Sequence, residues 1–450
     1  MIDPSFRKRF LSGNYVLMAL LLTTVVLVWV SSNYKWGDKH WRNIIKDDGA
    51  GYYAYLPATF IYDDLSFQYF DKLVEQGIVK ENQTKDFRNY IQGNAINKFY
   101  AGTAVAQIPF FLLGHLVSVI MNQPLTGYTA YYMIFFQIGT IFYLMTGLFF
   151  LNSFLKLYGI GNKARALVLI ATVFGTNIFH YTVSEPSMSH VFSFSFVCMF
   201  LFGAKHYFIS PKNRYALLAA FAMGMIILIR PVNVIILLSL PFLAGGFSNF
   251  KYGFIEFFKK PFIAILAILI AIAIPATQLM IYYIQTGEFF VYSYRGEGFD
   301  FLHPNMLDIL ISYRKGLFVY TPIAFLSLFG GYYLWKKSRF EFFSLLAFLI
   351  ILTWVLSSWR QWYYGGSFSA RVFIEYLPFF ALMLGLLLDG LKNPRIRKLV
   401  ISFVFVLILL CQFQTYQYRT AVIHWSEMDK EKYWNVFADP SFLFDKGEEE

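Results

Sequence analysis

Eleven long apolar runs constrain this chain more than any other feature. They lie near residues 11–30, 128–151, 165–183, 189–208, 214–229, 231–246, 262–285, 317–335, 342–358, 373–391 and 398–413. A helix of about 20 apolar residues spans the hydrocarbon core of a bilayer. Only 14% of the 450 residues are charged, whereas a soluble domain carries about 25%. The sequence therefore predicts an all-α polytopic membrane protein with about eleven transmembrane helices.

The net charge and the cysteine content exclude other classes. The formal charge of +11 would suggest nucleic acid in a soluble chain, but in a membrane protein the distribution of cations between loops matters more than their sum. Cys198 and Cys411 both lie inside apolar runs, so neither a disulfide framework nor a cysteine metal site is expected. We expect membrane lipids as partners, and no nucleic acid.

One further apolar segment, residues 103–121, decides the orientation of the later helices. If it lies in the outer interface, the N-terminus and five later loops face the cytoplasm with 19 cations against four acids, and the outside holds 19 cations against 23 acids. If it crosses, those five cationic loops all face outward, against the positive-inside rule. We therefore predict a juxtamembrane helix over 103–121, with the N-terminus in the cytoplasm and the C-terminus outside.

This orientation divides the chain into four parts. Residues 1–33 are an N-terminal transmembrane anchor, and no small-residue cleavage site follows its apolar run. Residues 34–127 are a long first outer loop with juxtamembrane helices, and residues 128–415 are a transmembrane bundle with outer loops. Residues 416–450 are an outer tail, too short for a core of its own.

An acidic stretch in the first outer loop is the strongest candidate for chemistry. Asp47 and Asp48 precede two glycines and three tyrosines within Lys46–Pro57. Tyrosines settle at lipid headgroups, so a wet interfacial loop explains part of this pattern. Carboxylates gain nothing at this depth unless water, a cation or a reaction needs them. We expect Gly49 and Gly51 to let a bulky acceptor approach Asp48.

Polar residues at the other outer ends add mainly cations. Arg230 stands between two apolar runs beside Pro231, where it either snorkels to lipid phosphate or binds an anionic partner. Glu185–His190 is either a proline-containing turn with a solvated acid or part of a site. The loop Trp359–Arg371 contains Gly365 and Gly366, which allow close approach of a ligand. Further outer polar residues are Lys98, Arg295, Glu297, Arg314, Lys315, Arg360 and Glu375.

One carboxylate base and several cations at the outer surface suit sugar transfer from a lipid phosphate. The base takes a proton from the acceptor hydroxyl as its oxygen attacks the anomeric carbon. The leaving group is already a phosphate, so it needs cations rather than a second acid.

The order of these motifs resembles that of the GT-C membrane glycosyltransferases, the group of protein O-mannosyltransferases and lipid A aminoarabinose transferases. The family's Asp-x-x-x-Tyr-Ala motif is similar to Asp48–Tyr52, with Tyr53 in the place of the alanine. Lys98–Gly102 resembles the family's basic residue ahead of a second juxtamembrane helix, without its proline. The resemblance makes Asp48 the catalytic base. The predicted substrate-binding residues are Asp47, Tyr53, Lys98, Tyr100, Glu185, His190, Arg230 and Arg371.

The resemblance implies an inverting enzyme with a polyprenyl-phosphate-linked sugar donor, acting at the outer face of a bacterial inner membrane. Its acceptor could be a glycan, a lipid or a protein. No cofactor is expected, and a divalent metal is left open. One alternative is an O-antigen-type polymerase, although such an enzyme carries its chemistry in a large late outer loop. Another is a lipid flippase or transporter, in which ionisable residues would lie at mid-bilayer.

Overall fold

The computed structural model describes residues 14–79, 87–437 and 439–440. These residues form two compact units. Unit 1 contains residues up to Leu21, Tyr158–His180 and the chain from Glu297 onward, and unit 2 contains Leu22–Leu157 and Tyr181–Gly296. The boundaries fall inside helices α2 (Tyr15–Ser31) and α8 (Ile178–Val183).

Unit 2 is built on four long helices. They are α6 (Ala130–Leu157), α9 (His190–Ile209), α10 (Asn213–Ile229) and α13 (Pro261–Thr286). Without a hydrophobic driving force in lipid, helices associate closely where small residues let backbones approach. Each interface has such a residue: Gly147 of α6 lies against Phe194 and Ser195, Gly203 of α9 against Ala219, and Gly224 of α10 against Ile274. The four helices therefore pack in chain order.

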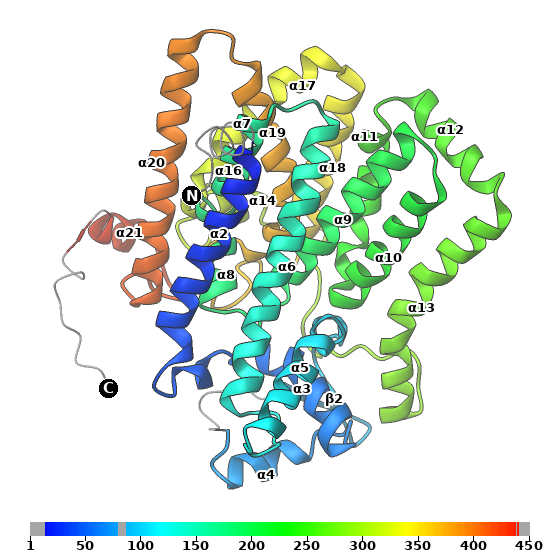
Figure 1. The fold of residues 1–450 in the computed structure, drawn as a ribbon, viewed down its shortest axis with the longest axis vertical. Coiled ribbons are helices and arrows are strands. Elements are labelled where there is room, and N and C mark those ends of the chain that lie inside the picture. Colours follow the sequence, from blue (N-terminus) through cyan, green and yellow to red (C-terminus); the bar gives the residue numbers. More distant parts are fainter. Residues whose placement is uncertain (1–13, 80–86, 438, 441–450) are drawn as a thin grey trace, which may run out of the picture. The chain divides into compact units, whose positions relative to one another are not determined.

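A cap of short helices, a β-hairpin and the longer helix α5 covers one end of this bundle (Figure 1). It consists of α3 (Asp48–Pro57), α4 (Tyr69–Glu75), the antiparallel hairpin of β1 (Arg88–Ile91) and β2 (Asn94–Asn97), and α5 (Gly102–Ile120). The π-helix Ser32–Trp36 and the 3-10 helix His40–Asn43 lead from α2 into the cap, and a second π-helix, Ala58–Tyr62, follows α3. The side chains of Trp36 and Gln137 are joined by a hydrogen bond of 2.9 Å.

The length of α6 separates the bundle from the cap. Gln137 donates to the Val183 carbonyl and Thr140 to the Pro186 carbonyl, so this part of α6 is level with the turn before α9. From Gln137 to Leu157 the helix rises about 30 Å at 1.5 Å per residue, which is the thickness of the hydrocarbon core. The residues of α6 before Gln137 therefore extend past the bundle and into the cap.

Helix α5 lies beside this extension of α6. Its first residue, Gly102, packs on the backbone of Leu228 and Ile229 at the end of α10. Further along, Gln107 donates to the Phe136 carbonyl and His115 contacts the Tyr132 hydroxyl, so α5 runs away from the bundle. This packing supports the prediction of a juxtamembrane helix, although α5 is also long and apolar enough to be a candidate span.

The run after Arg230 is a 3-10 helix, Pro231–Ser239, followed by α11 (Leu240–Ala244). Helix α12 (Phe247–Phe258) then turns by 116°. A 3-10 helix rises about 2.0 Å per residue, so these two short elements together reach about 25 Å. Proline at positions 231 and 241 removes two backbone donors. After α12, the Lys260 side chain donates to the carbonyl of Pro211, between α9 and α10. This bond joins two of the cationic loops that the sequence predicts to be cytoplasmic.

Apart from the starts of α2 and α8, unit 1 contains α7 and the later helices of the chain. They are α7 (Asn162–Phe174), α14 (Met306–Ile311), α15 (Leu317–Tyr320), α16 (Pro322–Leu328), α17 (Gly331–Lys337), α18 (Arg339–Ser357), the 3-10 helix Arg371–Tyr376, α19 (Leu377–Gly390), α20 (Pro394–Arg419) and α21 (Lys430–Val436). Helix α19 is the core of the unit, with most of its side chains buried. Gly330 allows the α16–α17 segment to touch the Met383 backbone.

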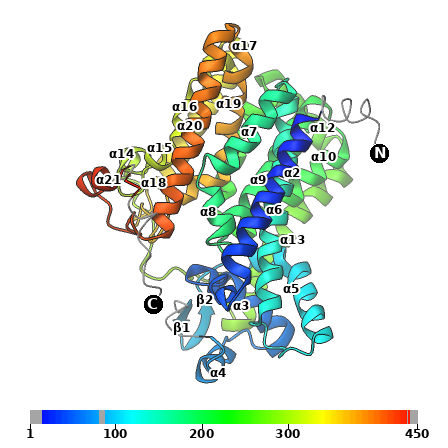
Figure 2. The same ribbon diagram turned by 60° about the vertical axis from the view of Figure 1, so that its left-hand side comes forward.

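The two ends of unit 1 differ in polarity. At one end, Lys337 donates to the Tyr158 carbonyl, and Asp389 accepts from the Gly161 amide and lies 3.9 Å from Arg397. At the other end, the tail packs into an aromatic cluster whose buried members are Tyr320, Phe368, Ile423, Met428 and Tyr433. Figure 2 shows α21 beside the lower end of α20. The tail therefore shares the core of unit 1.

The helices confirm an all-α polytopic protein but not the predicted number of spans. Within the described residues, eight helices are long and apolar enough to cross a membrane, or nine if the bent pair counts as one. The predicted spans 165–183 and 317–335 are broken, the first at Gly175–Asn177 and the second around Thr321 and again near Gly330. Glycine and proline explain the breaks, since both disfavour continuous helix.

If α5 is a juxtamembrane helix, as the sequence predicts, the turn 122–127 faces outward. Gln123 is exposed, while Cys198 and Cys411 are buried. A Gln123→Cys variant should therefore react with an impermeant thiol reagent on intact cells. Lys212→Cys, at the opposite end of unit 2, should react only after permeabilisation. The reverse pattern would mean that α5 crosses the membrane.

Candidate active site

The candidate site begins at the N-terminus of α3. Asp48 opens this helix and is half-buried, while the Asp47 side chain is 67% exposed. Carboxylates are stabilised at a helix N-terminus, where the macrodipole is positive. Asp47 has φ 51° and ψ −134°, a conformation that costs a non-glycine residue about 1–3 kcal/mol and often occurs at functional sites. The backbone therefore directs the two neighbouring carboxylates differently.

The glycines of α3 pack against protein rather than facing a ligand. A Cβ on Gly49 would lie 1.9 Å from the Ser187 Oγ, and one on Gly51 would lie 2.3 Å from the Phe99 ring. Our expectation that these glycines admit an acceptor is therefore wrong. They allow α3 to fit closely between the turn 184–189 and the segment 97–101, which brings Glu185 and Lys98 towards Asp48.

The segment after β2 is fixed to α3 by hydrogen bonds. Asn97 donates to the Gly51 carbonyl at 2.7 Å and accepts from the Phe99 amide at 2.9 Å. The Tyr55 hydroxyl donates to the Phe99 carbonyl at 2.7 Å. Lys98 and Tyr100, on either side of Phe99, are only half-buried. The backbone of this segment is thus held rigidly while the two predicted side chains keep access to solvent.

Arg230 lies at the end of α10, next to the start of α5. Its amide donates to the Ile226 carbonyl, and its own carbonyl accepts from Asn233. A Cβ on Gly102 would lie 2.4 Å from the Ile229 amide nitrogen, so only glycine fits there. This contact places the Arg230 turn beside the segment that carries Lys98.

Tyr294, in the loop after α13, lies among these groups. Its ring stacks on Tyr100 with centroids 6.5 Å apart and lies 5.2 Å from the Lys98 Nζ. The pKa of Tyr294 is raised well above its ordinary value, mainly by burial and then by Tyr52, while Arg230 opposes the rise and Asp48 adds to it. Asp48 and Arg230 are therefore both within electrostatic range of one hydroxyl.

Ser293 and Tyr294 were not among the residues predicted from the sequence, although Arg295 and Glu297 beside them were predicted to be outer polar residues. Ser293 donates to the Lys98 carbonyl at 2.8 Å, and its own carbonyl accepts from Asn89 at 2.7 Å. These bonds fix the loop after α13 to the hairpin. The polar run from Ser293 to Glu297 was visible in the sequence, but only the fold places it beside Lys98.

Lys46 joins Glu185 to the start of α3. Its Nζ lies 3.6 Å from the Glu185 Oε1 and 3.9 Å from the Asp47 Oδ2. Burial lowers the pKa of Lys46, but the carboxylates of Glu185 and Asp47 outweigh it, and the net pKa is raised. Among the described residues, no group of three or more His, Cys, Asp or Glu side chains is arranged to hold a metal ion.

Two predicted substrate contacts belong to the packed interior instead. Tyr53 is completely buried, its hydroxyl donates to the Gly127 carbonyl, and its ring contacts Tyr128 and Phe136. His190 is also completely buried at the start of α9, with its ring against Tyr181. Both residues lie at the end of unit 2 that carries the cap. However, neither side chain is exposed to a substrate in this structure.

Arg371 belongs to unit 1, whereas the other predicted site residues are in unit 2. It opens the 3-10 helix Arg371–Tyr376 and is half-buried. The loop before it depends on both glycines: Gly365 has φ +67°, and a Cβ on Gly366 would lie 3.0 Å from Trp425. These glycines serve a turn and a packing contact.

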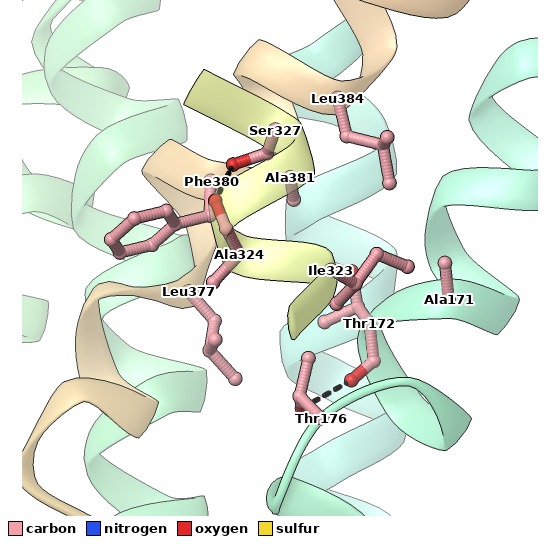
Figure 3. Close-up of a pocket in the computed structure, with 10 residues that line it drawn as sticks. All are labelled: Ala171, Thr172, Thr176, Ile323, Ala324, Ser327, Leu377, Phe380, Ala381 and Leu384. Carbon is pink, nitrogen blue, oxygen red and sulfur yellow. Dashed lines mark hydrogen bonds between the residues drawn. The ribbon is translucent and has the colours of Figure 1, made fainter. Parts of the chain in front are cut away.

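A cavity inside unit 1 lacks the character of a reaction site (Figure 3). It has a volume of about 20 Å³ and lies between α7, α16 and α19, which is room for about one water molecule. Its three hydroxyls, from Thr172, Thr176 and Ser327, each donate to a carbonyl of their own segment. The remaining lining is apolar, so the cavity is a packing gap.

Comparisons with known proteins give structural relatives only. No family model matches the chain, and no curated protein does. An oligosaccharyltransferase from Archaeoglobus fulgidus, tethered to an acceptor peptide with the NVT sequon, is 10% identical with a TM-score of 0.50, over 96% of this chain and 57% of that one. Its apo form is 12% identical with a TM-score of 0.49, over 95% and 59%. The AglB complex with an inhibitory peptide and a dolichol-phosphate is 11% identical with a TM-score of 0.48, over 94% and 57%.

The tethered structure, with a TM-score of 0.50, covers nearly all of this chain, and the two therefore share a fold. This agrees with the helical membrane fold that the sequence predicts. The chain spans less than three-fifths of that protein's length.

The contact of Gly49 with Ser187 gives a stability test of the site's framework. Gly49→Ala forces a methyl group into the Ser187 side chain, and overpacking of this kind costs about 1–3 kcal/mol. Thermal unfolding in detergent should therefore occur at a lower temperature. Adding Ser187→Gly should restore most of the loss.

Gly37→Ala is the matched control, because nothing lies within 4 Å of a Cβ there. It should unfold close to the wild-type temperature. An unchanged unfolding temperature for Gly49→Ala, or failure of Ser187→Gly to compensate, would contradict the contact.

Proposed function

We propose that this chain is a membrane glycosyltransferase that moves a sugar from a polyprenyl-phosphate-linked donor to an acceptor at the outer membrane face. The observation that carries the proposal is the grouping of Asp48, Lys98 and Arg230 around Tyr294 at one end of unit 2. The GT-C fold supports it, because relatives with this fold are oligosaccharyltransferases. The activity, the donor and the acceptor are all part of the proposal.

In the proposed reaction Asp48 is the base. Its carboxylate accepts the proton of the acceptor's nucleophilic group as that group's heavy atom forms a bond to the anomeric carbon. The bond between that carbon and the phosphate oxygen breaks at the same time, and the phosphate leaves with the electron pair. One displacement inverts the configuration, and general base catalysis typically contributes about 10²- to 10⁴-fold.

Arg230 and Lys98 are proposed to hold the donor phosphate. Lys98 lies 5.2 Å from the Tyr294 ring, and Arg230 acts electrostatically on the hydroxyl of the same tyrosine. The backbone on either side of Lys98 is fixed by hydrogen bonds of Asn97 and Phe99. Cations aimed at the leaving oxygen stabilise the charge that grows there in the transition state. The acceptor would approach from the exposed side of Asp47. The cationic loops at the opposite end of the bundle support the proposed outer location.

Polar side chains at the helix ends favour this function over a flippase. The charged residues of the site belong to the cap and to the turns at 185 and 230, not to the middle of a span, where a translocation pathway would need them. An O-antigen-type polymerase would carry its chemistry in a large late outer loop. It fits less well, because the described polar cluster is built mainly on the first outer loop.

The first functional prediction concerns the base. Asp48→Asn keeps the shape and loses the proton acceptor, so transfer should fall by about 10²- to 10⁴-fold, while donor binding survives. Asp48→Glu moves the carboxylate by one methylene, and a shift of about 1 Å can cost 10²-fold. Transfer of labelled sugar by purified protein is the measurement.

Asp47→Asn is the matched control for this prediction, since it makes the same chemical change one residue earlier and should be much milder. If Asp47→Asn reduced sugar transfer and Asp48→Asn did not, the motif would be shifted by one residue and Asp47 would be the base. If neither variant reduced transfer, the proposed role of Asp48 would be refuted.

The second functional prediction concerns the donor phosphate. Arg230→Ala should weaken donor binding by a charge-assisted contact of about 1.5–3 kcal/mol, measured with polyprenyl phosphate and purified protein. Lys72→Ala removes an exposed cation from α4 of the cap and should leave binding unchanged. If wild type and Arg230→Ala bound polyprenyl phosphate with equal affinity, Arg230 would contact the headgroups of membrane lipids rather than the donor phosphate.

A further inference from the structure

Lys46 has a contact pattern that the proposed reaction does not use. Its ammonium lies between two carboxylates from separate parts of the chain, Glu185 in the turn before α9 and Asp47 before α3. The Glu185 side chain is only 14% exposed, whereas that of Lys46 is 34% exposed. Glu185 is therefore the more buried member of the ion pair, and part of the Lys46 side chain remains accessible to solvent.

Stability alone does not account for this arrangement. Partly exposed ion pairs with separations of 3.6 and 3.9 Å add little to the stability of a fold. Gly49, which follows these residues, is packed tightly on Ser187, so the turn and α3 are already joined without the lysine. The position of the ammonium beside two acids at the edge of the site calls for another role.

Pairs of carboxylates beside a phosphate site commonly bind a divalent ion. Mg²⁺ in particular is held by one or two protein carboxylates together with the oxygens of a substrate phosphate. In this chain an ammonium occupies the place between the carboxylates, and a second cation there would be repelled by it. Lysine can make the remaining contact itself, because it binds phosphate as a point charge through three donors.

We propose that Lys46 is the cation that links Asp47 and Glu185 to the donor phosphate, so that the site binds its lipid phosphate without a divalent metal. Lys46 is thus a substrate-binding residue for the proposed function, and the inference deepens that proposal. The carboxylates position the ammonium, and its solvent-exposed part contacts the phosphate. No bond is made or broken in this step.

The test compares metal binding and phosphate-lipid binding in four purified full-length proteins. They are the wild type, Lys46→Met, Lys46→Arg and the matched control Lys72→Met, which removes an exposed lysine of the cap. Binding of Mn²⁺, alone and with inorganic phosphate, is followed by electron paramagnetic resonance. Binding of polyprenyl phosphate is measured with EDTA and with Mn²⁺.

Wild type, Lys46→Arg and Lys72→Met should show no saturable Mn²⁺ site and should bind polyprenyl phosphate equally with EDTA or Mn²⁺. Lys46→Met should bind the lipid more weakly in EDTA and regain affinity in Mn²⁺, with a saturable Mn²⁺ site that Glu185→Gln abolishes. Lys46→Gln provides a second neutral variant if Lys46→Met folds poorly.

Two results would overturn the inference. One is a saturable Mn²⁺ site in the wild type that depends on Glu185. The other is unchanged lipid binding in EDTA for the neutral Lys46 variants. Neither readout requires sugar transfer, so a wild type that binds phosphate lipid without metal but transfers no sugar would refute the proposed function and leave the role of Lys46 standing.

Discussion

The close fit of α3 between two other segments is the contact on which the candidate site depends. A helix in lipid has its backbone satisfied internally and can be positioned by simple packing, but the cap carries polar residues that must be placed by specific contacts. Gly49 on Ser187 and Gly51 on Phe99 provide that placement from opposite sides. Asn97 and Tyr55 then fix the second contact with hydrogen bonds. The chain segments that carry Asp48, Glu185 and Lys98, from three regions of the sequence, pack together for this reason.

Much of the fold followed from hydrophobicity, because the bilayer imposes helix on any long apolar run. The location of the charged residues at helix ends was predictable for the same reason: Asp48, Lys98, Glu185 and Arg230 could only lie where polar groups reach water. The count of cations between loops predicts that all four face the outer side. Their detailed neighbours did not follow, because loop packing leaves no periodic signal. Tyr294 stands in a loop far from Lys98 in sequence, and only the fold joins them.

The wrong predictions share a physical cause. Tyr53 was assigned to substrate because it occupies the alanine position of the motif that Asp48–Tyr52 resembles, but successive residues of a helix face different directions. Tyr52 points towards Phe99 and the site, whereas Tyr53 points into the aromatic interior with Phe111 and Tyr128. The glycines were misinterpreted similarly: glycine permits close approach of any neighbour, and here the neighbour is protein. Breaks at Gly175 and Thr321 also went unrecognised, because hydropathy averages over them.

The charges of the site suggest how the proposed reaction would be coupled to donor binding. Three cations, Lys46, Lys98 and Arg230, are grouped with three carboxylates, Asp47, Asp48 and Glu185. A site of balanced charge at a membrane surface avoids isolated ions in a medium of low dielectric constant. A donor phosphate would compete with the carboxylates for the same cations. Lys46 is placed to share its ammonium with a phosphate in this way, because Glu185 holds it from the buried side while 34% of the lysine side chain is exposed.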